Sequence, residues 1–129
     1  IESVPRELPA LMRAQKIQHK AAKAGFDWDD INGALDKVYE EAGEVKEALA
    51  ENDGAHTAEE IGDLLFACVN VCRFAKTDGE EALTAATDKF ARRFKITEEL
   101  ARENGVDMKT ASIEELDRLW DEAKKRTND

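Results

Sequence analysis

The sequence has few of the residues that mark fibrous, membrane-spanning or nucleic-acid-binding proteins. Two prolines and seven glycines among 129 residues leave little room for flexible linkers. No apolar run approaches the roughly 18 residues of a membrane span, and no charged-then-apolar leader is visible. Basic residues are outnumbered, 19 against 29 acidic ones, so the net charge of -10 would repel a phosphate backbone. These absences disfavour a membrane and nucleic acid as partners, whereas acid excess suits divalent cations.

Cysteine is equally scarce. Cys68 and Cys72 lie four residues apart in an apolar helical run, where a thiol usually behaves as a small buried hydrophobe. Adjacent helical turns rarely offer the geometry of a disulfide, so we expect reduced thiols and a cytoplasmic protein. The length fits one domain, residues 1–129. Because the chain starts at Ile1 rather than Met, we expect that domain to be a fragment of a longer chain.

Apolar residues recur at helical spacing along nearly the whole chain, without the alternation typical of strands. The pattern therefore predicts an all-α protein. Thr57 with Glu60, and Ser112 with Glu115, have the spacing of capping boxes. The predicted helices run from about Pro9 to Ala24, Asp30 to Glu51, Thr57 to Lys76, Glu80 to Glu103, and Ser112 to Lys124. Four long helices with short connections favour an antiparallel four-helix bundle, here with a short fifth helix at its C-terminal end.

Two pairs of acids stand at equivalent places on the second and third predicted helices. At about 100° per residue, Glu44 lies about 60° from Glu41, and Asp63 lies about 60° from Glu60, each pair at the edge of an apolar seam. The short connection between the helices requires an antiparallel pair, and this brings both edges to one side. The seams that we expect to be buried are Ile31, Leu35, Val38, Ala42, Val45 and Leu49 in the second helix, and Ile61, Leu64, Leu65, Cys68 and Cys72 in the third.

Four converging carboxylates repel one another unless a cation joins them, and Mg²⁺ prefers such oxygen ligands. The spacing therefore predicts a magnesium site. The alternative is that Glu60 only completes a capping box and that Glu41 and Glu44 lie on a solvated helix face.

Basic residues extend the prediction to phosphate. Lys37 lies one turn before Glu41, where it could meet a phosphate or simply form an ion pair with that acid. Lys89 and Arg93 form a like-charge pair beside two phenylalanines, which is unfavourable unless an anion or an acidic neighbour joins them. Carboxylates for metal and cations for phosphate together outline a polyphosphate site.

The motif "EEAGE" at 40–44, followed by "EIGD" at 60–63, resembles the EExxE and ExxD signature of the all-α nucleoside triphosphate pyrophosphohydrolases. Further blocks are similar to the C-terminal catalytic domain of the MazG family over nearly the whole chain. They read "LPALMRAQKIQHKAAKAGFDW", "DKVYEE", "GDLLFACVN" and "KFARRF". The resemblance implies a homodimer that requires Mg²⁺ and cleaves ribonucleoside and deoxyribonucleoside triphosphates to monophosphate and pyrophosphate.

The resemblance also assigns roles to residues. It implies that Glu41, Glu44, Glu60 and Asp63 bind the metal, that Lys37, Lys89 and Arg93 hold phosphates, and that Trp120 stacks near the base. A hydrophobic anchor for the last helix is the other role open to Trp120. As general base we expect Glu41 first, within the cluster that includes Glu40.

Two positions leave the assignment open. His56 stands where the family pattern has a lysine that approaches the triphosphate, and histidine is charged only below about pH 6.5. Asn70 lies one step further along the acid edge, where it could bind metal, water or substrate, or form a hydrogen bond between helices. The functional alternatives are a narrower enzyme for dUTP, dCTP or phosphoribosyl-ATP, and a non-catalytic helical dimerisation or docking domain.

Overall fold

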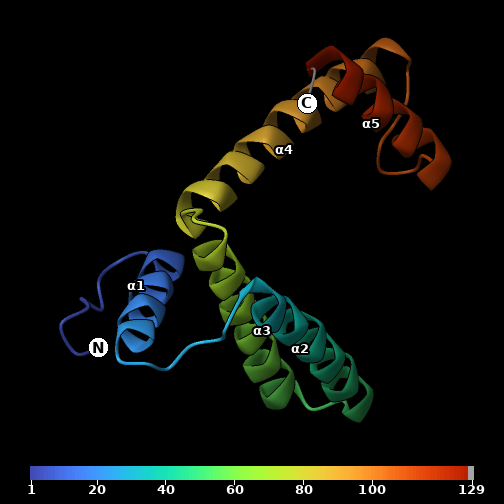
Figure 1. Cartoon of the computed structure of the whole chain (residues 1–129). Helices are drawn as coiled ribbons and strands as arrows, with labels where there is room; N and C mark the ends of the chain where they lie inside the picture. Colours follow the sequence, from blue (N-terminus) through green and yellow to red (C-terminus); the bar gives the residue numbers. More distant parts are fainter. Residues whose placement is uncertain (128–129) are drawn as a thin grey trace. The chain divides into compact units, whose positions relative to one another are not determined.

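A computed structural model describes residues 1–127, and within them it contains five α-helices and no strand. The helices are α1 (Ala10–Lys23), α2 (Ile31–Glu51), α3 (Gly54–Phe74), α4 (Gly79–Glu103) and α5 (Ile113–Thr127) (Figure 1). The all-α prediction is confirmed, and the helix packing is consistent with a bundle. The chain forms two compact units, Ile1–Ala82 and Leu83–Asp129, which are described separately below.

The helix ends lie within two residues of the predicted ones except at the start of α3 and at the end of α5, which continues to Thr127 rather than Lys124. Asp30 caps α2 through a hydrogen bond that its carboxylate accepts from the Asn32 amide at 2.8 Å. Ser112 caps α5 by accepting from the Glu115 amide at 3.1 Å, as predicted. By contrast, α3 begins at Gly54, and Asp53 is its cap.

The predicted Thr57 cap is therefore wrong. The Asp53 carboxylate accepts from the His56 amide at 3.2 Å, while the Thr57 hydroxyl donates to the Asp53 carbonyl at 2.8 Å. The "NDG" turn supplies an earlier cap because Asn52 adopts the left-handed conformation, with φ of 57°, and ends α2 at once. Glu60 consequently lies in the second turn of α3 and is not a capping-box residue.

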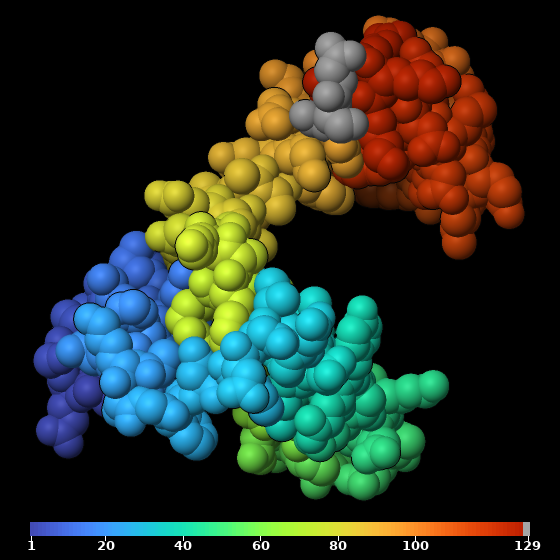
Figure 2. Space-filling model, viewed as in Figure 1, coloured from blue at the N-terminus to red at the C-terminus, as the bar shows by residue number. Residues whose placement is uncertain are grey.

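The first unit is built on an antiparallel hairpin of α2 and α3, with α1 packed against α3 (Figure 1). Small side chains line the contact between the two long helices, where Ala34, Ala48 and Ala67 are almost fully buried. The segment 24–30, light blue in Figure 2, runs from α1 to the start of α2. Alanines at the contact allow the helix backbones to approach closely, so any side chain that shares this face is enclosed as well.

The predicted seams are only partly buried. Leu49 of α2 and Leu65 of α3 are 61% and 53% exposed, and Leu35 and Ile61 are exposed too. Cys68, expected in the core, is exposed as well, and both cysteines are free thiols as predicted. The reason is that the alanine face makes the contact between α2 and α3, which turns the larger apolar side chains outward.

The second unit packs the C-terminal part of α4 against α5. Leu100 and Ala101 of α4 and Leu119 and Ala123 of α5 form its core, and Ile96, Val106 and Met108 pack around them. Ile113, predicted on the apolar face of the last helix, is 74% exposed because it is the first residue of α5. Among the described helices of both units, none combines the length and apolarity needed to cross a bilayer.

Candidate metal centre and adjoining cavity

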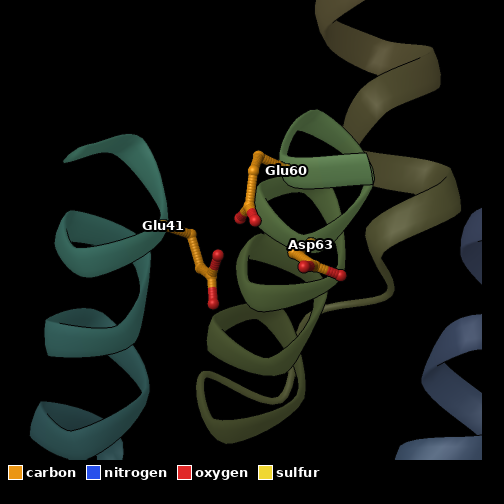
Figure 3. Close-up of side chains that lie close together, drawn as sticks. All are labelled: Glu41, Glu60 and Asp63. Atoms are coloured by element: carbon orange, nitrogen blue, oxygen red, sulfur yellow. The ribbon is translucent and has the colours of Figure 1, made fainter. Parts of the chain in front are cut away.

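Three acids meet where α2 faces α3. Glu41 comes from α2, and Glu60 and Asp63 lie one turn apart on α3, with one carboxylate oxygen from each within 4.8 Å of the others (Figure 3). Glu41 and Glu60 are only 5% and 8% exposed, whereas Asp63 is exposed. Helical spacing places Glu60 and Asp63 on one face, and the antiparallel hairpin brings Glu41 opposite them.

Each buried carboxylate has one oxygen paired with a basic side chain and one without a partner. Glu41 Oε1 lies 3.0 Å from Lys37 Nζ, and Glu60 Oε1 lies 3.1 Å from His56 Nε2. Glu41 Oε2 and Glu60 Oε2 are buried and accept no hydrogen bond. A buried carboxylate oxygen without a partner is unfavourable. Hard carboxylate oxygens grouped in this way fit a divalent cation such as Mg²⁺.

Glu44, the fourth predicted ligand, lies beside this cluster. The pKa of Glu44 is raised to about 7, first by a hydrogen bond with Glu60 and then by the charge of Glu41. The structure thus brings the four predicted acids together, three of them in the tight group and Glu44 next to Glu60. This is the crowding of like charges that the seam-edge pattern predicts.

The two basic side chains at the site, Lys37 and His56, are both held by acids. Lys37 pairs with Glu41 and, at 3.4 Å, with the exposed Glu40, and these contacts raise the pKa of Lys37. His56 Nδ1 lies 3.2 Å from Glu51, and this contact, followed by that with Glu60, raises the pKa of His56. The ion pair between Lys37 and Glu41 that the sequence left open is therefore formed.

A cavity of about 630 Å³ adjoins the acids. Glu41, Asp63 and Lys37 lie at its acidic part, and aromatic and aliphatic side chains from α1, the following segment and α3 form much of the rest. The other lining residues are Ile17, Gln18, Ala21, Gly25, Phe26, Asp27, Trp28, Phe66, Ala67, Asn70 and Arg73. A cavity of this size is typical of small-molecule sites.

An ion pair holds the segment after α1 against α3. The Arg73 guanidinium donates to both oxygens of Asp27, at 2.6 and 3.0 Å. Arg73 also donates to Asn70 Oδ1 at 3.0 Å, so the oxygen of Asn70 is engaged within α3. This network places Phe26 and Trp28 beside the cavity.

Sequence reasoning did not find Gln18, Phe26, Trp28 or Arg73 as site residues. One signal was available, because "GFDW" places two aromatic side chains on a connecting segment, where function is common. Gln18 carried no such signal.

In the second unit, Arg93 and Trp120 lie together. The Arg93 guanidinium is 5.9 Å from the centre of the Trp120 ring, and Phe90 is 5.3 Å from that ring. Lys89 is exposed. Leu119 and Ala123 are the α5 residues in the core of this unit, while Trp120 is half-buried.

The fold and the site define a class: an all-α protein with a cluster of carboxylates where two helices of a hairpin face each other. The MazG nucleotide pyrophosphohydrolase domain matches residues 31–98, which include Glu41, Glu60 and Asp63, and the chain belongs to this family. It is 44% identical over 131 residues to the nucleoside triphosphate pyrophosphohydrolase of Escherichia coli, covering all of this chain and 50% of that protein. It is 46% identical over 117 residues to the nucleoside triphosphate pyrophosphohydrolase/pyrophosphatase MazG of Thermotoga maritima, covering 91% and 45%. The chain thus spans about half the length of these relatives.

Proposed function

We propose that this chain hydrolyses nucleoside triphosphates to nucleoside monophosphate and pyrophosphate with Mg²⁺ as cofactor. The observation that carries the proposal is the pair of buried carboxylates, Glu41 and Glu60, each with an unpartnered oxygen beside a cavity of nucleotide size. The names of the relatives supply the substrate class. Glu44 and Asp63 complete the proposed ligand set.

Bound Mg²⁺ would lower the pKa of a water molecule, orient the triphosphate and neutralise charge on the departing pyrophosphate. The chain's own residues position the substrate and move a proton. Glu41 is the first choice to accept the proton of the attacking water, with Glu40 as the other candidate. Lys37, already held at Glu41, carries a positive charge into the same cavity and suits a phosphate oxygen.

Four further roles complete the proposal: three rest mainly on the resemblance, and that of Asn70 rests on its place along the acid edge of α3. Lys89 and Arg93 are proposed to contact phosphates, and Trp120 is proposed to stack near the base. His56 is proposed to approach the triphosphate, although Glu51 and Glu60 already engage its ring. Asn70 lines the cavity and is proposed to contact substrate through its amide N–H groups, because its oxygen accepts from Arg73.

We further propose a homodimer. Leu35 and Leu49 of α2 and Ile61 and Leu65 of α3 are apolar and exposed on the first unit. A second copy of the chain covering this surface would remove it from water, and burial of apolar area drives such association. The free thiols Cys68 and Cys72 fit a reducing, cytoplasmic location.

The test is pyrophosphate release from a panel of ribonucleoside and deoxyribonucleoside triphosphates, with Mg²⁺ and with EDTA. Mg²⁺-dependent release across many bases is the expected result. One dominant nucleotide, such as dUTP or dCTP, would correct the proposal to a narrow enzyme. No release by a folded protein that also binds no Mg²⁺ would replace it with a helical docking domain.

A further inference from the structure

A second cavity, of about 670 Å³, lies between the N-terminal segment and α1. It is bounded by residues 3–8, by one face of α1 and by residues at and just after the end of α3, and none of the clustered acids of α2 and α3 lines it. Its apolar part consists of Val4, Pro5, Leu8 and Met12. The chemistry proposed above uses none of these residues, so this cavity is separate from the acidic one.

Lysines form the opposite part of the lining. Lys16, Lys20 and Lys23 all line the cavity, and at 100° per residue they lie within an arc of about 60° on α1. Within residues 1–127, none of these three ammonium groups forms an ion pair. The helix dipole favours Lys20 and Lys23 in the last turn, but Lys16 lies one turn earlier. Like charges one turn apart repel, so the arrangement is unfavourable until an anion joins it.

Acidic side chains do not balance this charge. Asp78 is the one acid among the lining residues, and its carboxylate accepts a hydrogen bond from the Glu81 amide at 3.1 Å. His19 lines the cavity as well and offers a further polar contact. In a chain with a net charge of -10, a cavity lined mainly by basic side chains runs against the overall composition and selects for an anion.

Arg73 lines this cavity and the acidic one. Four of its five N–H groups are engaged, two with Asp27 and two with Asn70. The fifth, on Nη1, has no acceptor in the part of the chain that the structure describes. Arg73 therefore has one donor left for a ligand, besides those that hold Asp27.

We propose that the second cavity binds a small organic phosphate, with the phosphate at the three lysines of α1 and the organic group against the apolar part. A lysine ammonium is a compact charge with three donors, and it is a common phosphate ligand. A phosphate monoester carries close to two negative charges at pH 7, so it suits three lysines better than a carboxylate does. The apolar lining favours an anion that carries a carbon group over inorganic phosphate.

The test is calorimetry on the metal-free chain at pH 7.5 and low ionic strength, with phenyl phosphate and inorganic phosphate as probes. Phenyl phosphate should bind at least about tenfold more tightly, because only its ring buries apolar surface. The double variant Lys16→Gln with Lys20→Gln should weaken phenyl phosphate binding by at least about tenfold, since it removes two charged donors. Lys37, which lines the acidic cavity, is unchanged in this variant, so the loss locates the ligand.

The matched control is Lys46→Gln with Lys109→Gln. Both lysines are exposed and line neither cavity, and the change in net charge is the same, so phenyl phosphate affinity should stay within about twofold. No binding of phenyl phosphate, or an equal loss in the two double variants, would overturn the proposal and leave only a general attraction of anions to lysine. Equal affinity for phenyl phosphate and inorganic phosphate would overturn the assignment of an organic ligand.

Discussion

Glu41 and Glu60 are the residues on which the proposed cation site depends. Both are enclosed by the contact of α2 with α3, and each retains an oxygen without a hydrogen bond. A fold stabilised only by apolar packing would place a smaller apolar side chain at such positions. The presence of two glutamates at these enclosed positions is consistent with a site that is stabilised by a bound ligand.

Replacing Glu60 by Gln should reduce Mg²⁺ affinity and turnover by at least about 100-fold, because an amide offers one weaker ligand oxygen and no charge. Calorimetry with Mg²⁺ and pyrophosphate release measure the two effects. Glu47→Gln, an exposed acid on α2, is the control and should change neither. Unaltered Mg²⁺ binding in Glu60→Gln would remove Glu60 from the ligand set.

The Asp27 and Arg73 pair gives a prediction about pH. The hydrogen bond from Arg73 lowers the pKa of Asp27 below its usual value, so the pair stabilises the folded state above the unfolded pKa of about 4. This contribution is lost as the pH falls through the lowered folded pKa. Asp27→Asn should therefore lower the free energy of unfolding by about 1 kcal/mol at pH 7, and by progressively less below about pH 4.

Urea denaturation at pH 7 and at pH 3 measures the free energy of unfolding and checks this prediction. Asp29→Asn, an exposed acid two residues later, serves as the control. A difference between Asp27→Asn and the unaltered chain that stays constant down to pH 3 would show that the pair contributes no charge-dependent stability.

At the level of elements, the hairpin of α2 and α3 links packing to chemistry. Ala48 has no exposed surface and lies two turns after Glu41 on the face that meets α3. Its small side chain lets the helices approach closely enough for one oxygen each of Glu41, Glu60 and Asp63 to lie within 4.8 Å. The distance between the helices therefore sets the distance between the acids.

Ala48→Leu should separate the two helices, lower the free energy of unfolding by about 1–3 kcal/mol and weaken Mg²⁺ binding. Thermal unfolding and calorimetry measure these effects. Ala50→Leu is the control, because Ala50 is exposed on the same helix. If Ala48→Leu were destabilised but bound Mg²⁺ normally, the acids would be adjusting independently of helix spacing.

For the whole molecule, the exposed apolar surface formed by Leu35 and Leu49 of α2 and Ile61 and Leu65 of α3 predicts self-association. Leu49→Glu places a charge in the proposed dimer surface and should convert a dimer into a monomer at micromolar concentration. Light scattering coupled to size-exclusion chromatography gives the mass of each species. Glu47→Lys, about 140° around the helix from this surface at 100° per residue, should remain dimeric.

If the unaltered chain were a monomer, or if Leu49→Glu stayed dimeric, the surface would have another role. A monomeric unaltered chain would indicate that this surface binds a different partner. A dimeric Leu49→Glu variant would place the dimer contact elsewhere on the molecule.

Much of the fold and of the acidic site could be predicted because helical spacing is local. Helix positions follow from apolar periodicity, and the relation of Glu41 to Glu44, or of Glu60 to Asp63, follows from 3.6 residues per turn. The start of α3 was misplaced by three residues, because Asp53 and Thr57 are both good caps and the tight turn at Asn52 decides between them.

The sequence by itself determined the helices, the antiparallel hairpin and the convergence of its acids, since each depends on a short stretch of chain with fixed geometry. Tertiary structure decided which face of each helix is enclosed. Alanines rather than leucines made the contact, because small side chains allow the closer approach. Tertiary structure also determined the position of the cavity. There Gln18 of α1 donates a hydrogen bond to the carbonyl of Phe66 of α3, which lies 48 residues further along the chain. No spacing rule connects positions so far apart, because only packing brings them together.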